Sequence, residues 1–202
     1  MTQGDRVTVV LLAGGPATRL PGKLALDVEG EPMLVRSLRR LTALGWPCVV
    51  SVRAPLEPSL ATAFEGCAVA YDQLEDAGPL GGLHSALAHV RSPLFFAAAA
   101  DVPNLSAQFA ARLLAMYDAV MPKPDAVLPT WPDRHVEPLA ALYDRAAFAR
   151  GAARALASGQ RKVTAALEGA DVFPYLVGPA DEALFANVNT QADYDRVRAG
   201  AS

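Results

Sequence analysis

The stretch that decides the fold is VTVVLLAGGPATRLPGKLALDVEGEPML, residues 7–34. Its first six residues are almost wholly apolar, and the run stops at Gly14 and Gly15. A basic segment with Arg19 and Lys23 follows before the apolar pattern resumes. A short apolar run that ends at glycines is typical of a buried strand followed by a loop. The stretch therefore predicts a first strand whose end carries a ligand-binding loop.

Strands and helices are expected to alternate along most of the chain. Runs rich in Val, Leu and Phe predict strands, and the segments between them carry apolar residues at helical spacing. Such alternation implies right-handed crossovers and an α/β fold with three α/β/α layers around a mainly parallel sheet. No linker divides the sequence, so residues 1–202 are predicted to form a single domain. The strands are expected at 7–12, 48–52, 68–71, 94–100, 126–128, 139–143 and 171–176.

Capping residues and apolar spacing predict the limits of three of the helices. The first is expected to begin at Pro32 and to end at Gly45, because proline suits the first helical turn and glycine suits the end. A second is expected over residues 82–91, and a last one begins at about Gln191. The buried stripe of the first helix is predicted to hold Leu34, Leu38, Leu41 and Leu44.

Composition excludes several classes of function. The chain is 52% hydrophobic with a net charge of −3, which fits neither disorder nor a general affinity for nucleic acid. Its longest apolar run is far shorter than the roughly 20 residues that span a membrane. Cys48 and Cys67 lack the C-x-x-C spacing, which fits a reducing compartment and predicts no zinc site. We expect a cytoplasmic protein that binds small molecules or proteins, and neither nucleic acid nor a membrane.

The glycine loop is expected at the ligand-binding edge of the sheet. Ligands of open parallel sheets bind beyond the carboxyl ends of the strands, and Gly14 and Gly15 let backbone N–H groups approach a phosphate or a base. The spacing matches neither a Rossmann dinucleotide fingerprint nor a P-loop. Lys23 is one of three lysines beside 15 arginines, and its flexible ammonium suits a phosphate. On the glycines alone, a plain turn with solvated charges is an equal alternative.

Two aspartates end predicted strands at the same edge. Asp101 ends PLFFAAAAD, where a carboxylate can hold Mg²⁺ against triphosphate oxygens. The alternative is a helix cap, but Ser106 is the better cap of the next helix. Asp72 ends AVAYD, and the glycines of GPLGG, Gly81 among them, follow at a predicted helix start that favours anions. An ordinary turn and helix start is the alternative there.

The motifs, taken in order, carry a family resemblance. LAGG, Arg19, Lys23 and GEPML are followed by DAGPLGGLHSAL, AAADVPNLS, HVEPLAALYD and FANVNTQADYDRV over nearly the whole chain. Together they most resemble the molybdenum cofactor guanylyltransferase family of MobA-like nucleotidyltransferases. The resemblance implies a Rossmann-like nucleotidyltransferase fold, Mg²⁺ as cofactor, and GTP and the molybdopterin cofactor as substrates. Molybdoenzymes or cofactor-handling proteins would be the protein partners.

The resemblance also implies a reaction and its residues. GMP passes from GTP to the phosphate of molybdenum-molybdopterin, and pyrophosphate is released. The acceptor's own phosphate oxygen attacks, so no protein nucleophile is needed. The implied catalytic residues are Arg19, Lys23 and Asp101, with Asp101 as the metal ligand. The implied nucleotide-binding residues are Leu12, Ala13, Gly14, Gly15, Lys23, Asp72, Gly81 and Asp101. The implied acceptor-binding residues are His135, Asn187 and Asn189.

Two departures from the family pattern keep other functions open. The loop RLPGK is shorter than usual and is similar to that of cytidylyltransferases that activate sugar acids. Ser51 and Arg53 stand where the family often has an asparagine. The alternatives are a CTP-dependent cytidylyltransferase acting on molybdopterin or on a sugar acid or phosphate, and a non-catalytic carrier of the cofactor. The glycine spacing disfavours a Rossmann oxidoreductase.

Several late polar residues have ordinary roles as alternatives. Asn and Thr make turns and caps, and Thr190 suits the cap of the last helix. Arg134, Arg161 and Lys162 can pair with an acceptor phosphate or remain solvated loop charges. Trp131 can stack on a flat pterin ring or pack within its loop.

Overall fold

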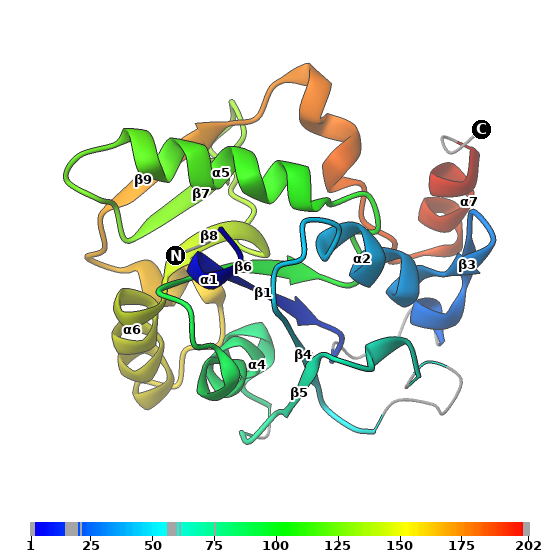
Figure 1. Ribbon diagram of the computed structural model, residues 1–202, viewed down its shortest axis with the longest axis horizontal. Coiled ribbons are helices and arrows are strands. Elements are labelled where there is room, and N and C mark those ends of the chain that lie inside the picture. Colours follow the sequence, from blue (N-terminus) through cyan, green and yellow to red (C-terminus); the bar gives the residue numbers. More distant parts are fainter. Residues whose placement is uncertain are drawn as a thin grey trace.

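A seven-stranded sheet forms the centre of the computed structural model, which describes residues 3–14, 20, 22–55, 60, 62–74 and 76–199 (Figure 1). Its strands are β1 (Val7–Leu12), β4 (Cys48–Val52), β5 (Ala68–Tyr71), β6 (Leu94–Ala99), β7 (Ala126–Thr130), β8 (Ala140–Asp144) and β9 (Val172–Leu176). They lie in the order β5-β4-β1-β6-β8-β7-β9. Only β8 is antiparallel to its neighbours among these strands, so the predicted mainly parallel sheet is confirmed.

All seven predicted strands are present. The first three match residue for residue, and the bounds of the other four differ by one or two residues. The largest difference is at β7, which continues to Thr130 because its backbone stays paired with β9, Thr130 opposite Leu176. The strands were predictable because each is a short apolar run bounded by glycine, proline or polar residues.

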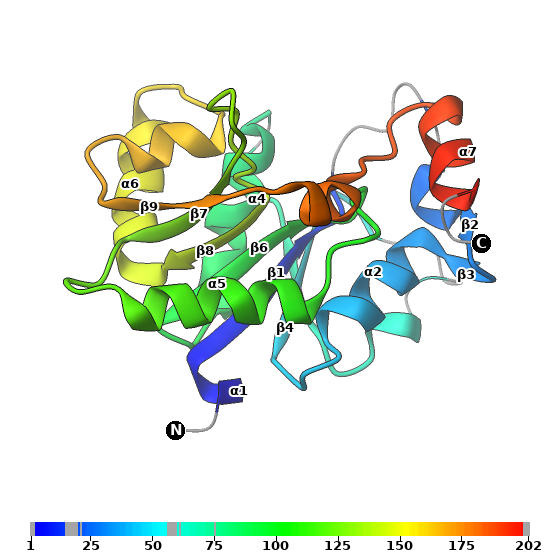
Figure 2. The same ribbon diagram turned by 90° about the horizontal axis from the view of Figure 1, so that it is seen from above.

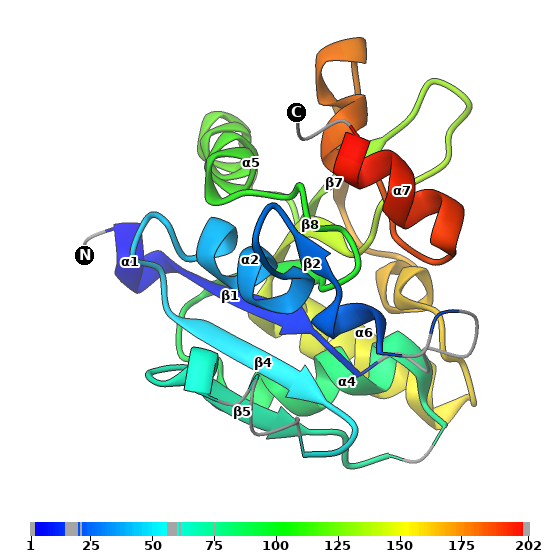
Figure 3. The same cartoon turned by 90° about the vertical axis from the view of Figure 1, so that its right-hand side faces the viewer.

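Helices cover both faces of the sheet, as the predicted three layers require. Helices α2 (Met33–Leu41) and α5 (Ala107–Ala119) lie on one face, and α4 (Gly78–Ala86) and α6 (Arg145–Ala157) on the other (Figure 3). Alternate residues of β1 serve both cores, because successive side chains of a strand point to opposite faces. Val9 packs on the side of α2 and α5, and Val10 on the side of α4 and α6.

Shorter elements surround this framework. Helix α7 (Gln191–Ala199) lies beside the hairpin formed by β2 (Asp27–Val28) and β3 (Glu31–Pro32) (Figure 2). Tyr194 Oη donates a hydrogen bond of 2.5 Å to the carbonyl oxygen of Asp27, and this bond joins α7 to the hairpin. Val28 and Val197 belong to the small apolar core between them. None of the described helices is long and apolar enough to cross a bilayer. The remaining elements are α1 (Gln3–Arg6) and the 3₁₀ helices η1 (Lys23–Ala25), η2 (Thr62–Phe64), η3 (Leu87–His89), η4 (Val163–Leu167) and η5 (Pro179–Phe185).

The predicted limits of two helices were wrong. Helix α2 ends at Leu41, and Leu44 is 43% exposed instead of lying on the buried stripe. The reason is a turn in which the N–H of Gly45, at φ 72°, donates to the carbonyl oxygen of Thr42. The other helix, predicted over residues 82–91, begins at Gly78 and ends at Ala86, where the 3₁₀ helix η3 continues the chain to His89. Its early start follows from a proline in its first turn, which is compatible with helical geometry there.

We expect Gly151→Ala to destabilise the protein. A Cβ atom at this position of α6 would lie 1.9 Å from the carbonyl oxygen of Ala166, so α6 and η4 must move apart. Alanine normally stabilises a helix interior relative to glycine, by up to about 1 kcal/mol. Here overpacking should reverse the sign and cost about 1–3 kcal/mol in the free energy of unfolding, measured in urea.

Ala153→Gly provides the matched control, because Ala153 is exposed on the same helix. It should lose only the propensity difference of about 1 kcal/mol. A Gly151→Ala protein that is as stable as the wild type, or more stable, would show that the close approach of α6 and η4 is not constrained.

Candidate active site

A cavity of about 300 Å³ opens where the parallel strands end. It is formed by the segments that follow β1, β4, β5 and β6, by the start of α4 and by the residue before β8. This is the carboxyl edge at which the glycine loop and both aspartates were expected. The lining residues are Leu12, Ala13, Gly14, Lys23, Leu24, Ser51, Arg53, Asp72, Gly78, Pro79, Gly82, Ala99, Ala100, Asp101, Leu139 and Asn189.

Lys23 links three distant segments of the chain at this cavity. Its Nζ donates to Oδ2 of Asp101 at 2.7 Å, to Oδ1 of Asn189 at 3.0 Å and to the carbonyl oxygen of Val188 at 3.2 Å. The side chains of Lys23 and Asp101 are only 11% and 23% exposed, so the ion pair is largely shielded from solvent. The cluster therefore places one ammonium among three oxygen acceptors at the edge of β6.

The segment that carries Asn189 is fixed by its own hydrogen bonds. The N–H of Val188 donates to the carbonyl oxygen of Asp101 at 2.8 Å. The N–H groups of Asn189 and Thr190 donate to Oδ2 of Asp193 at 3.0 and 2.8 Å, and the N–H of Asp193 donates to Thr190 Oγ1. Thr190 thus caps α7 as predicted. The hydroxyl of Thr190 and the N–H of Asn189 lower the pKa of Asp193 to about 2, because they stabilise its charged form.

A second polar group in the cavity, the Asp72 group, consists of Asp72, Ser51 and Arg53. Ser51 Oγ donates to Oδ1 of Asp72 at 3.2 Å, and Arg53 Nε lies 3.6 Å from Oδ2 of Asp72. The Asp72 side chain is 14% exposed and that of Arg53 is 37% exposed. Helix α4 approaches this group closely, because its residue 82 is a glycine. A carboxylate with a neighbouring guanidinium therefore presents acceptors and donors together.

The end of β1 lies close to the end of β4. The N–H of Ala13 donates to the carbonyl oxygen of Ser51 at 2.8 Å. A Cβ on Gly14 would lie 3.1 Å from the backbone nitrogen of Arg53, which is tighter than ordinary contact. The first glycine of the loop is thus used for close backbone approach. Two other predicted residues of this loop, Gly15 and Arg19, lie outside the described residues.

Some predicted site residues lie away from the cavity lining. Gly81 is inside α4, where its neighbours Gly78, Pro79 and Gly82 line the cavity instead. Asn187 lines a second cavity of about 360 Å³. His135 is in the loop between β7 and β8, with its Nε2 3.6 Å from Glu137 Oε1. The structure therefore brings Asn189, but neither Asn187 nor His135, to the lining around Lys23.

The β7–β8 loop is ordered by its aromatic residue. Trp131 Nε1 donates to Glu137 Oε1 at 3.0 Å, and its ring contacts Phe185 edge to face at 5.5 Å. These are packing contacts of the kind expected as the alternative to pterin stacking. Leu139 follows this loop and lines the cavity, and its carbonyl oxygen accepts from the N–H of Ala99. The loop is thus adjacent to the edge of β6.

The oxygen donors fit a metal that arrives with a nucleotide. Within the described residues, no three His, Cys, Asp or Glu side chains gather into a metal cluster. Mg²⁺ is usually bound by one or two carboxylates together with substrate phosphates, so it needs no all-protein cage. The carboxylate of Asp101 and the amide oxygen of Asn189 share the ammonium of Lys23. Ser106 caps α5, as predicted, and leaves Asp101 available.

Sequence reasoning assigned no role to several lining residues. Ser51 and Arg53 were noticed only as departures from a family pattern, and Leu139 and Pro79 were not considered. Their common signal is position, because each is at or near the cavity-facing end of a strand or helix. Such residues can be found from strand ends alone, although their partners cannot.

Comparison with known proteins places the chain in a family. The model of the family described as the MobA-like NTP transferase domain matches residues 9–172. The chain belongs to this family. A relative named probable molybdenum cofactor guanylyltransferase, from Natronomonas pharaonis, is 32% identical over 96% of this chain and 98% of its own length. The molybdenum cofactor guanylyltransferase of Burkholderia vietnamiensis is 36% identical over 79% and 80%.

A solved structure agrees with this assignment. The molybdopterin-guanine dinucleotide biosynthesis protein A of Archaeoglobus fulgidus superposes with a TM-score of 0.76 at 25% identity, and the match covers 95% of this chain and 97% of that one. The family predicted from the ordered motifs is therefore confirmed. The α/β fold of MobA-like transferases accounts for the parallel strands whose ends meet at the cavity.

We expect Gly82→Ala to weaken nucleotide binding. The added Cβ would lie 3.0 Å from Ser51 Oγ and 3.2 Å from Asp72 Oδ1, so it would displace these two side chains of the Asp72 group. A loss of about 1.4 kcal/mol, equal to a tenfold rise in Kd for nucleoside triphosphate, is expected by calorimetry. Gly178→Ala is the matched control, because a Cβ there meets no atom within 4 Å. Unchanged affinity in both variants would exclude this group from nucleotide binding.

Proposed function

We propose that the protein transfers GMP from GTP to the phosphate of molybdenum-bound molybdopterin and releases pyrophosphate. The observation that carries the proposal is the convergence of Lys23, Asp101 and Asn189 on the cavity that the glycine loop also lines, in a MobA-like chain. The names of the relatives support both the nucleotide and the acceptor. We further propose that residues 1–202 act as one domain.

Positioning and electrostatics supply the catalysis in this proposal. A phosphate oxygen of the acceptor attacks the α-phosphorus, a new P–O bond forms, and the bond to the β-phosphate bridge breaks in line as pyrophosphate leaves. Lys23, whose ammonium is held among oxygen acceptors, stabilises the negative charge of the phosphates, and we assign the same role to Arg19. No protein nucleophile takes part.

Magnesium is the proposed cofactor. Asp101 would hold it with the nucleotide's phosphates, and Asn189 contributes a neighbouring amide oxygen. A magnesium ion held there would supply positive charge that neutralises and orients the triphosphate. Lys23 already compensates the charge of Asp101 before the substrate arrives.

The Asp72 group is proposed to bind the base or the ribose. Guanine presents N–H donors beside its O6 acceptor on one edge. Asp72 offers carboxylate oxygens beside the guanidinium donors of Arg53, which is the complementary arrangement. This complementarity supports GTP as the nucleotide. Leu12, Ala13 and Gly14 would form the wall along the triphosphate.

Asn189 is the acceptor-binding residue that the geometry favours. It lines the cavity and shares Lys23 with Asp101, so an acceptor phosphate beside it would lie near the α-phosphate. His135 is in a loop adjacent to the edge of β6, and Asn187 is two residues before Asn189, so we propose both for parts of the acceptor that extend beyond the cavity. Molybdoenzymes or cofactor-handling proteins are the proposed recipients of the product.

Pyrophosphate release tests the reaction. GTP, CTP, ATP and UTP are each incubated with molybdenum cofactor or with a sugar phosphate, in Mg²⁺. We expect release with GTP and the molybdenum cofactor only, its loss on chelation, and recovery when Mg²⁺ is restored. A preference for CTP would change the proposed product, and nucleotide binding without release from any pair would indicate a carrier.

Asp101→Asn tests the catalytic group. The change removes the charge that pairs with Lys23 and that would hold the metal, so turnover should fall by at least about 100-fold, as for other lost electrostatic contacts in active sites. Asp195→Asn, at an exposed position of α7, is the control and should keep full activity. Circular dichroism checks that both variants fold. Normal turnover by folded Asp101→Asn would contradict the mechanism.

A further inference from the structure

Two free thiols lie side by side at the edge of the sheet opposite the cavity. Cys48 is the first residue of β4, and Cys67 immediately precedes β5. The two strands pair in parallel with Val49 opposite Ala68, so one step back along this register places Cys48 opposite Cys67. The proposed function uses neither residue.

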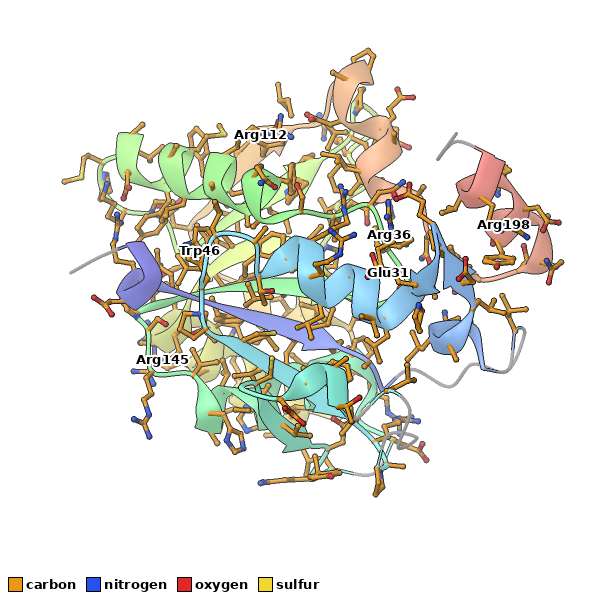
Figure 4. The ribbon with its side chains drawn as sticks, turned by 45° about the vertical axis from the view of Figure 1, so that its right-hand side comes forward. Glu31, Arg36, Trp46, Arg112, Arg145 and Arg198 are labelled. Atoms are coloured by element: carbon orange, nitrogen blue, oxygen red, sulfur yellow. The ribbon has the colours of Figure 1, made fainter. Side chains whose placement is uncertain are left out.

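The two side chains point to the same face of the sheet. Cys48 belongs to the core beneath α2 and α5, which also contains Trp46 (Figure 4), and Cys67 packs against this core. Each thiol shifts the pKa of the other. Neighbouring strands lie about 4.8 Å apart, within the roughly 4.4–6.8 Å between Cα atoms that a disulfide requires. The spacing of the backbone therefore already suits a covalent bond between them.

The two thiols differ in reactivity. The hydrogen bond to Cys67, followed by burial, raises the pKa of Cys48, which is 7% exposed. The hydrogen bond from Cys48 lowers the pKa of Cys67 to about 7, against the opposing effect of burial. The thiolate is the reactive form of cysteine, so Cys67 is the nucleophile of the pair at neutral pH. It is half-buried next to the edge strand of the sheet, where a small oxidant can reach it.

We propose that Cys67 is a site of oxidation by peroxides and that Cys48 converts the oxidised residue into an intramolecular disulfide. This inference does not depend on the proposed transferase activity. It assigns a modification site to the far ends of β4 and β5, the same strands whose other ends lead to Ser51 and Asp72.

The chemistry balances with hydrogen peroxide as the oxidant. The Cys67 thiolate attacks one peroxide oxygen, so an S–O bond forms, the O–O bond breaks, and hydroxide leaves as Cys67 becomes a sulfenic acid. The sulfur of Cys48 then attacks that sulfur, the S–S bond forms, the S–O bond breaks, and water leaves with the Cys48 proton. In sum, two thiols lose two electrons and two protons, and the peroxide is reduced to two waters. A thiol reductant reverses the change.

Peroxide treatment of the full-length reduced protein tests the proposal. The protein is exposed to hydrogen peroxide at neutral pH, its remaining free thiols are blocked with N-ethylmaleimide, and its intact mass is measured by mass spectrometry. We expect a monomer that has lost the mass of two hydrogen atoms and carries no maleimide, and that accepts two maleimides after reduction. Peptide mapping without reductant should join the peptides that contain Cys48 and Cys67.

Single substitutions separate the roles of the two thiols. In Cys48→Ala, sulfenic acid should accumulate at Cys67 and be trapped by dimedone, because no resolving thiol remains. In Cys67→Ala, oxidation of Cys48 should be at least about 10-fold slower, because buried thiols are inert. The pH midpoint for alkylation of Cys67 should move from about 7 toward the ordinary value near 8.5 in Cys48→Ala, since its hydrogen-bond donor is lost.

The proposal fails if peroxide leaves both thiols of the wild-type protein free to take maleimide. It also fails if the disulfide that forms joins two chains, or if Cys48→Ala and Cys67→Ala react with peroxide at equal rates. None of these measurements uses GTP or a pterin. Their outcome is therefore independent of the test of the proposed transferase activity.

Discussion

The parallel pairing of β1 with β4 and β6 is the constraint on which the site depends. Leu12, the last residue of β1, lies opposite Ser51 on one side and Ala99 on the other. The three strands thus end at the same edge, and the segments that follow them meet there. A slip of one residue would turn alternate side chains to the other face and would separate the glycine loop from Asp101.

Lys23 connects this edge to segments that the sheet does not reach. Its ammonium compensates the charge of the poorly exposed Asp101 and also bonds the segment before α7. The small core between the β2–β3 hairpin and α7 supports both sides of this contact, because Val28 and Val197 pack within it. Leaving either partner of such a shielded ion pair without the other is costly, which favours keeping these segments together.

The comparison of predicted and observed elements shows which features a sequence pattern can detect. Strand runs and the caps Ser106 and Thr190 were predicted because they depend on a few adjacent residues. The limits of α2 were not, since apolar spacing continued to Leu44 while a turn at Gly45 had already ended the helical hydrogen bonds. Periodicity reports which face a residue would occupy in a helix, but not where the helix stops.

The sequence by itself determined the strands, the three layers, the family, and the edge at which the glycine loop and Asp101 would lie, because these follow from local periodicity, strand direction and the order of motifs. Only the tertiary structure decided which polar groups meet. It joins Lys23 to Asn189 and places Asn187, two residues away, at another cavity. Hydrogen-bond partners far apart in sequence are chosen by the packing of the whole chain, and spacing along the sequence does not encode them.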